Sequence, residues 1–136
     1  MTRGEVLQKK DPYWWMHPAY KGEQALDLAT LDALPAGAYR RIHFKDRAEY
    51  ATDENAMQTP QGNFVEFAQL LYKANGFRCG PVTDWFVVIC VEPGNWWAVG
   101  QLVADPETPI WVFDDLVFDS EDDARERAQS LKSTAD

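Results

Sequence analysis

Six carboxylates near the C-terminal end form the densest group of side chains in this sequence that could do chemistry. They are Asp114, Asp115, Asp119, Glu121, Asp122 and Asp123. The Asp-x-Asp-x-Asp-Gly pattern of a calcium loop is missing, and the last three acids follow Ser120 as acids do at a helix start. We therefore interpret the group as part of a binding surface, and we expect no metal and no cofactor.

Asp114 and Asp115 stand within an otherwise apolar run, residues 110–118, that has the composition of a strand. Neighbouring residues of a strand point to opposite faces, so a regular strand would bury one of these carboxylates. A bulge, or a break between Phe113 and Leu116, explains the pair without burial. A carboxylate that is buried, with a raised pKa, would instead mark a functional site.

The nucleophilic and basic side chains show no catalytic spacing. The histidines are His17 and His43, and neither stands in a motif with a serine, cysteine or aspartate. No glycine-rich phosphate loop or dinucleotide fingerprint is present. We expect no catalytic residue. The two cysteines are predicted to be free thiols, with Cys79 in a loop and Cys90 inside a strand.

A small basic patch precedes the acidic part of the chain. Its members are Arg40, Arg41, Lys45 and Arg47. Binding to nucleic acid requires clustered Lys and Arg that neutralise phosphates. Because four charges on an acidic protein are too few, we expect these side chains to pair with the protein's own carboxylates.

Charge favours a basic protein as the partner. The chain has 13 basic and 22 acidic residues, hence a net charge of −9. Residues 1–47 hold eight basic and six acidic residues, whereas residues 48–136 hold five and sixteen, a net charge of −11. Such a surface repels nucleic acid and anionic membrane, and it speeds encounter with basic proteins. The alternative interpretation is an acidic surface that only keeps the protein soluble.

Aromatic residues concentrate in two places. Residues 13–20 read Tyr-Trp-Trp-Met-His-Pro-Ala-Tyr, and a Trp-Trp pair opens the run 96–104. The first interpretation of the N-terminal segment is that it lies across a face of the sheet, where its rings bury a large area. The second is a binding patch, because Trp and Tyr are enriched at interface hot spots. The aromatic binding candidates are Trp14, Trp15, Trp96 and Trp97.

The apolar runs 85–92, 96–104 and 110–118 predict an antiparallel meander, because turns rich in Pro, Gly and Asn separate them. The first run is apolar on both faces, which is typical of a central strand covered on both sides. One helix layer and the N-terminal aromatic segment could supply that cover. Gly100 predicts a bulge or a close approach of another group.

The other elements are predicted from periodicity and capping residues. Helices are expected at 23–34, at 63–75 with Asn63 as its cap, and from Ser120 onward, and an edge strand is expected at 38–44. Residues 1–22 are expected to be mostly irregular, and 45–62 remain open between helix and loop. The 136 residues thus predict a single two-layer α+β domain, with a mainly antiparallel sheet of about four strands, a C-terminal three-stranded meander and three flanking helices.

These features favour a non-enzymatic acidic binding protein. We expect a small inhibitor or immunity-type antagonist, of the kind bacteria use, that covers a basic site of a toxin, nuclease or nucleic-acid-handling complex. One alternative is an assembly module that forms a homo-oligomer through its aromatic surface, and another is an enzyme with an unrecognised site. The N-terminus lacks the apolar core of a signal peptide, and no run approaches the length of a membrane span, so a cytoplasmic location is expected.

Overall fold

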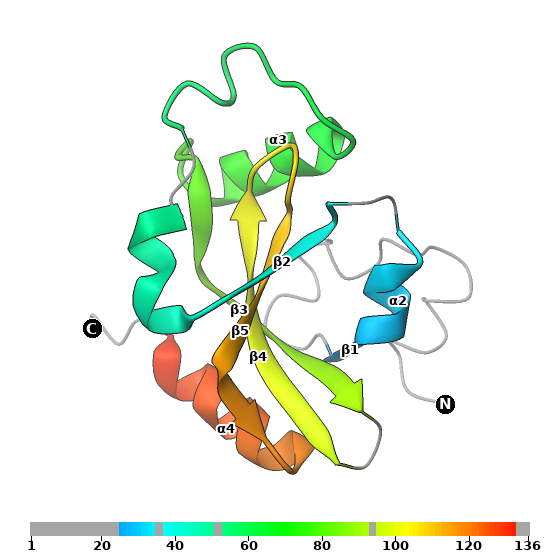
Figure 1. Cartoon of the computed structure of the whole chain (residues 1–136). Coiled ribbons are helices and arrows are strands. Elements are labelled where there is room, and N and C mark those ends of the chain that lie inside the picture. The colour runs from blue at the N-terminus through cyan, green and yellow to red at the C-terminus, as the bar shows by residue number, and fades with distance from the viewer. Residues whose placement is uncertain (1–24, 35–36, 51–52, 93–94, 133–136) are drawn as a thin grey trace.

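The computed structural model describes residues 25–34, 37–50, 53–92 and 95–132, and Figure 1 shows how they are arranged. The elements in chain order are strand β1 (Ala25–Asp27), helix α2 (Leu28–Asp32), strand β2 (Tyr39–Ile42), the 3₁₀ helix η3 (Phe44–Tyr50), helix α3 (Val65–Ala74), strands β3 (Gly80–Glu92), β4 (Trp96–Ala104) and β5 (Ile110–Phe118), and helix α4 (Glu121–Leu131). None of the helices described here is both long and apolar enough to cross a membrane.

A single mixed sheet of five strands, in the order β1-β3-β4-β5-β2, makes this an α+β fold. The predicted meander is confirmed, because β3, β4 and β5 pair antiparallel. The mainly antiparallel four-strand sheet is wrong at both edges, where β1 pairs parallel with β3 and β2 pairs parallel with β5. Both outer strands are very short, and their own residues carry no signal of which strand they will join.

The first helix is much shorter than the sequence predicts. Residues 25–27 form β1 instead, and only the five residues of α2 are helical. The reason is a tertiary contact, because Leu26 is buried and lies opposite Ile89 of strand β3. Burial of this side chain in the sheet outweighs the weak helical preference of the segment.

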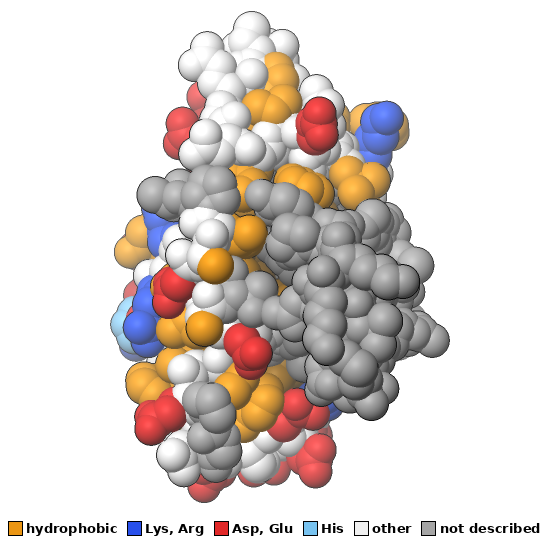
Figure 2. Space-filling model, turned by 90° about the vertical axis from the view of Figure 1, so that its right-hand side faces the viewer, with side chains coloured by type: hydrophobic (Ala, Val, Ile, Leu, Met, Phe, Trp, Pro, Cys, Tyr) orange, Lys and Arg blue, Asp and Glu red, His pale blue; other side chains and the backbone are white. Residues whose placement is uncertain are grey.

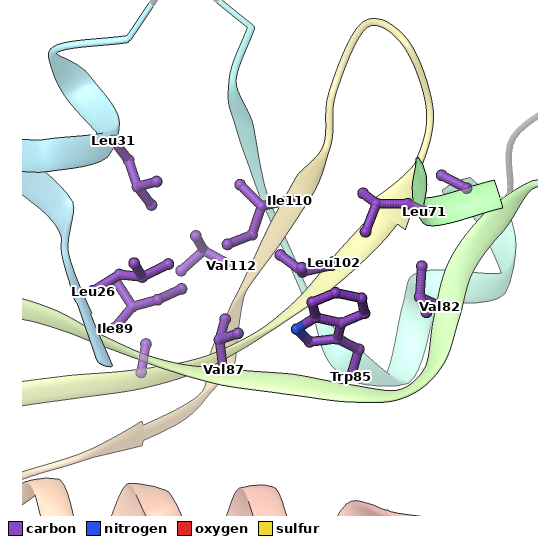
Figure 3. Close-up of a cluster of buried hydrophobic side chains, with 12 residues drawn as sticks. Leu26, Leu31, Leu71, Val82, Trp85, Val87, Ile89, Leu102, Ile110 and Val112 are labelled. Carbon is purple, nitrogen blue, oxygen red and sulfur yellow. The ribbon is translucent and has the colours of Figure 1, made fainter. Parts of the chain in front are cut away.

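The long interior strand β3 has two apolar faces, as predicted. Trp85, Val87 and Ile89 join one core cluster, while Phe86 and Val88 join a second on the opposite face. The first cluster takes Leu31 from α2 and Leu71 from α3, and the second takes Ala124 and Ala128 from α4. Figure 3 shows the first cluster, with α4 on the other side of the sheet.

Helices therefore cover both faces of the sheet, and the predicted two-layer arrangement is wrong. The aromatic segment 13–20, predicted to cover one face, lies outside the described residues.

Two strands carry irregularities that matter for the surface. The register of β3 against β4 shifts between Pro81 and Phe86. The register of β5 against β4 shifts after Phe113, so that Val117 is the next paired residue. This is the bulge that Asp114 and Asp115 predicted.

The helix starts show one success and one error. Ser120 caps α4 as predicted, since its Oγ accepts a hydrogen bond from the Asp123 N–H at 3.1 Å. Asn63 does not cap α3: Phe64 occupies that position, without a side-chain cap. Phe64 is 1% exposed and its N–H donates to the Pro106 carbonyl at 2.9 Å, so burial and a loop contact fix the helix start.

Candidate interaction surface

Two of the predicted tryptophans lie at one end of the sheet, next to the start of α4. A row of paired residues crosses four strands there: Asp27 lies opposite Cys90, Cys90 opposite Trp97, and Trp97 opposite Phe118. The chain leaves β5 after Phe118 and enters α4 at Glu121. The register places Trp97 opposite Phe118, just before the chain turns into α4, and Trp96 is its neighbour at the same end of the sheet. Trp97 packs on the face that α4 covers, and Trp96 points to the opposite face because neighbouring strand residues alternate.

Four of the six predicted carboxylates accompany these tryptophans. Asp119, Asp122 and Asp123 are exposed, and Glu121 is partly exposed. Glu121 pairs with Arg125 one turn along the helix, at 3.1 Å between Oε2 and Nε. Figure 2 shows acidic side chains gathered at this lower end of the molecule. We call the set Trp96, Trp97, Asp119, Glu121, Asp122 and Asp123 the Trp–acid surface.

The two tryptophans differ in exposure. Trp96 is 37% exposed, and Trp97 is partly buried against the second core cluster. Val117, on the neighbouring strand, is 40% exposed. Large apolar side chains that stay partly exposed beside charged groups can supply the central contacts of an interface. Trp14 and Trp15 lie outside the described residues.

Asp114 and Asp115, the other two predicted binding residues, have partners within the protein. Asp114 pairs with Arg41 of β2 at 2.9 Å, which confirms that a member of the basic patch pairs with the protein's own acid. Asp115 accepts hydrogen bonds from the backbone N–H of Phe44 at 2.6 Å and of Lys45 at 3.4 Å. Asp115 thus caps the first turn of η3. These two carboxylates stabilise the junction of β2, η3 and β5.

The hydrogen bonds to Asp115 change its acidity. Burial by itself raises the pKa of this carboxyl, but the N–H donors of Phe44, Lys45 and Asp115 itself, together with nearby His43, outweigh it and lower the pKa. A carboxylate with a lowered folded-state pKa stabilises the fold above its unfolded-state pKa. That contribution disappears as the pH falls through the folded-state value.

Asp115→Asn is expected to lower the free energy of unfolding by about 1 kcal/mol at neutral pH, because an amide oxygen accepts weaker hydrogen bonds than a carboxylate. Denaturant unfolding at a series of pH values measures this. The difference between the parent and the variant should shrink as the pH falls below the ordinary aspartate range and through the lowered pKa of Asp115. A difference that stays constant over this range would contradict the capping role.

Both cysteines are free, as predicted. Cys79 lies in the loop before β3 and is partly exposed, whereas Cys90 is buried in β3. Burial raises the pKa of the Cys90 thiol, and the negative charges of Asp27 and Glu121 raise it further. The reactive thiolate of Cys90 is therefore scarce as well as inaccessible.

A thiol reagent is expected to modify Cys79 at least about tenfold faster than Cys90 in the native protein, because Cys90 must await local opening. Mass spectrometry of the labelled peptides over time measures both rates. Added reductant should leave the melting temperature unchanged. Equal rates for the two thiols in the folded protein would contradict the burial of Cys90.

Sequence reasoning missed a second site. Arg47 belongs to the basic patch, and Gln101 is a polar residue within the apolar run 96–104. The structure brings them together, with Arg47 Nη1 donating to Gln101 Oε1 at 3.0 Å, although 54 positions separate them. A glutamine within an apolar strand was the available signal, because a buried amide requires partners.

The described part of the chain contains no cluster of His, Cys, Asp or Glu that could hold a metal ion. The chain matches no protein-family model, no curated protein and no solved structure. The functional interpretation therefore depends on the geometry of the surface and its charge.

Proposed function

We propose that this protein is a non-enzymatic binding protein whose Trp–acid surface covers a basic site of another protein. The class that fits best is a small inhibitor or immunity-type antagonist of a toxin, nuclease or nucleic-acid-handling complex. The observation that carries the proposal is that exposed Asp119, Asp122 and Asp123 and the partly exposed Trp96 lie at the same end of the sheet.

The charge of this end supports a basic partner. Arg125 forms an ion pair with Glu121, while Asp119, Asp122 and Asp123 are exposed to solvent. Residues 48–136 carry a net charge of −11, so the field around the surface is negative. A nuclease or toxin that acts on nucleic acid presents a basic site, and charge of opposite sign accelerates encounter with that site.

The apolar part of the surface supports stable binding after encounter. A tryptophan buries a large area when it enters a pocket on a partner, and central aromatic residues often dominate interface energies. Trp96 is partly exposed and begins β4, at the end of the sheet where the exposed acids also lie. Carboxylates at the margin of an interface mainly set the association rate, while the aromatic anchor mainly sets the dissociation rate.

The surface is also fixed in shape before binding. Trp97 is held by its pairing with Cys90 and Phe118, and the start of α4 is held by the Ser120 cap. Surfaces on strands and helix ends lose less conformational entropy on binding than mobile loops do. A preformed surface suits an antagonist that must bind tightly.

Affinity capture from an extract of the source cells tests the proposal. The parent should retain a basic protein at low salt, and both the triple variant Asp119→Asn/Asp122→Asn/Asp123→Asn and the single variant Trp96→Ala should lose it. The control is Glu49→Gln/Glu54→Gln/Glu66→Gln, which makes the same charge change at exposed positions elsewhere and should retain the partner.

Two results would overturn the proposal. If the parent and both surface variants retain the basic protein equally, the Trp–acid surface is not part of the interface. Light scattering that shows an oligomer of the parent and a monomer of Trp96→Ala would favour the assembly module, in which the partner is a second copy of the chain.

A further inference from the structure

A pocket of about 360 Å³ lies near the opposite end of α4 from the Trp–acid surface. It is bounded by η3, by the bulged part of β3, by β4 and by the last turn of α4, which Figure 1 shows beside η3. The lining residues that matter are Arg47, Asp84, Phe86, Gln101 and Leu131. Its volume falls at the lower end of the range of small-molecule sites.

Arg47 is held in place by the protein before any ligand arrives. Gln101 is 3% exposed, and its amide uses both ends: Oε1 accepts from Arg47 at 3.0 Å, and Nε2 donates to the Val82 carbonyl at 2.9 Å. The guanidinium also lies over the ring of Phe44, at 4.1 Å from the centroid. A buried amide and an aromatic ring thus fix both the direction and the plane of this cation.

A guanidinium has about five N–H donors, and within the described residues one of those of Arg47 is taken, by Gln101. Within the described residues Arg47 forms no ion pair, whereas Arg41 and Arg125 do. Burial lowers the pKa of Arg47, which reflects the loss of water around its charge. A partly desolvated guanidinium with unused donors interacts strongly with an anion that reaches it.

The rest of the pocket restricts the kind of anion. Arg47 is the one cation among the described lining residues, so the pocket does not have the surplus positive charge that a phosphate dianion requires. Asp84 has φ = 63°, a conformation that is uncommon for a residue other than glycine and that occurs where the register of β3 shifts. Such conformations concentrate at binding sites. Phe86 and Leu131 add apolar surface.

The geometry points to a binding site for a small monocarboxylate with an apolar or aromatic body. The ligand carboxylate would accept hydrogen bonds from Arg47, and its body would lie against Phe86 and Leu131. This site is separate from the Trp–acid surface. A test of carboxylate binding here is therefore independent of any test of the proposed protein partner.

Nuclear magnetic resonance with sodium phenylacetate as the probe tests the site. Titration should shift the Arg47 Nε–H signal and the amide signals of Thr83, Asp84 and Phe86 along one saturable curve, with a dissociation constant on the order of 1 mM for so small a ligand. Phenylacetamide, the neutral analogue, should bind at least about tenfold more weakly because it lacks the charge. Equal shifts with the two compounds would overturn the assignment.

Two variants and one control locate the binding. Arg47→Gln should weaken phenylacetate binding at least about tenfold, and Arg47→Lys should weaken it less, since it keeps the charge without the planar fork. Lys73→Gln, which removes an exposed cation on α3, should leave binding unchanged. The dispersion of each variant's spectrum shows that it is folded. Unchanged binding by a folded Arg47→Gln variant would overturn the proposal.

Phenyl phosphate distinguishes the two kinds of anion that an arginine binds. It should bind more weakly than phenylacetate, because the one cation in the described lining, Arg47, balances only one of its two negative charges. Tighter binding of phenyl phosphate, lost in Arg47→Gln, would overturn the carboxylate assignment and make this a phosphate site.

Discussion

Gly100→Ala is expected to lower the free energy of unfolding by about 3 kcal/mol. A Cβ atom at this position would lie 2.5 Å from the carbonyl oxygen of Trp111 and 2.6 Å from Cδ1 of Ile89. The oxygen belongs to the backbone of the neighbouring strand, so it moves only if the pairing of β4 and β5 moves. Gly100 therefore permits the close approach of β5, which is one of the two roles its sequence position predicted.

Gly76→Ala is the matched control for this substitution. Gly76 differs from Gly100 in having a positive φ, 67°, and a Cβ there would meet nothing within 4 Å. The expected cost is about 1 kcal/mol, from the backbone conformation alone. Denaturant unfolding of the two variants measures both costs. A cost for Gly100→Ala no larger than that for Gly76→Ala would contradict the close packing of the sheet.

Ile89→Ala is expected to lower the free energy of unfolding by roughly 2–5 kcal/mol. Ile89 is 0% exposed at the centre of β3 and lies between Leu26 of β1 and Ala98 of β4 (Figure 3). Its removal leaves a cavity between α2 and the sheet, because the strands on both sides fix the backbone. The hydrophobic transfer term and the cavity term then add.

Val117→Ala is the control for Ile89→Ala. Val117 lies on the same sheet but is 40% exposed, so its truncation should change the free energy of unfolding by only about 0.5 kcal/mol. Thermal and denaturant unfolding measure both variants. A melting temperature for Ile89→Ala within a degree or two of the parent would contradict the burial of Ile89 in an interior strand of the sheet.

The central part of the fold could be predicted because its signals are local. The alternation of Trp85, Val87 and Ile89 with Phe86 and Val88 predicts two buried faces, and the structure has both. The Ser120 cap could be predicted for the same reason, since the serine and its partner Asp123 lie within one turn.

The edges of the sheet could not be predicted because they depend on distant residues. Strand β1 forms where Leu26 meets Ile89, and nothing in the segment itself distinguishes three strand residues from the first turn of a helix. Strand β2 was correctly placed at an edge, but its parallel pairing with β5 is set by the fold. Helical cover of both faces likewise depends on how the helices return to the sheet.

The candidate interaction surface likewise has a part that could be predicted from local sequence and a part that could not. The acidic group was visible in the sequence, but only the structure separates Asp114 and Asp115, which have intramolecular partners, from the exposed acids at the start of α4. The register of β4 explains why Trp96 and Trp97 lie at the same end of the sheet as those acids. The pocket at Arg47 could not be predicted, because Gln101 is far from it in sequence.

Association kinetics across a salt series test the function of the Trp–acid surface most directly. With the captured partner, the triple variant Asp119→Asn/Asp122→Asn/Asp123→Asn should associate about tenfold more slowly than the parent at low salt, and its rate should depend less on salt. It should remain folded, because the lost helix-dipole interactions amount to only about 1–2 kcal/mol. Trp96→Ala should mainly raise the dissociation rate. Association rates and salt dependences equal to those of the parent would contradict a role for this surface in binding.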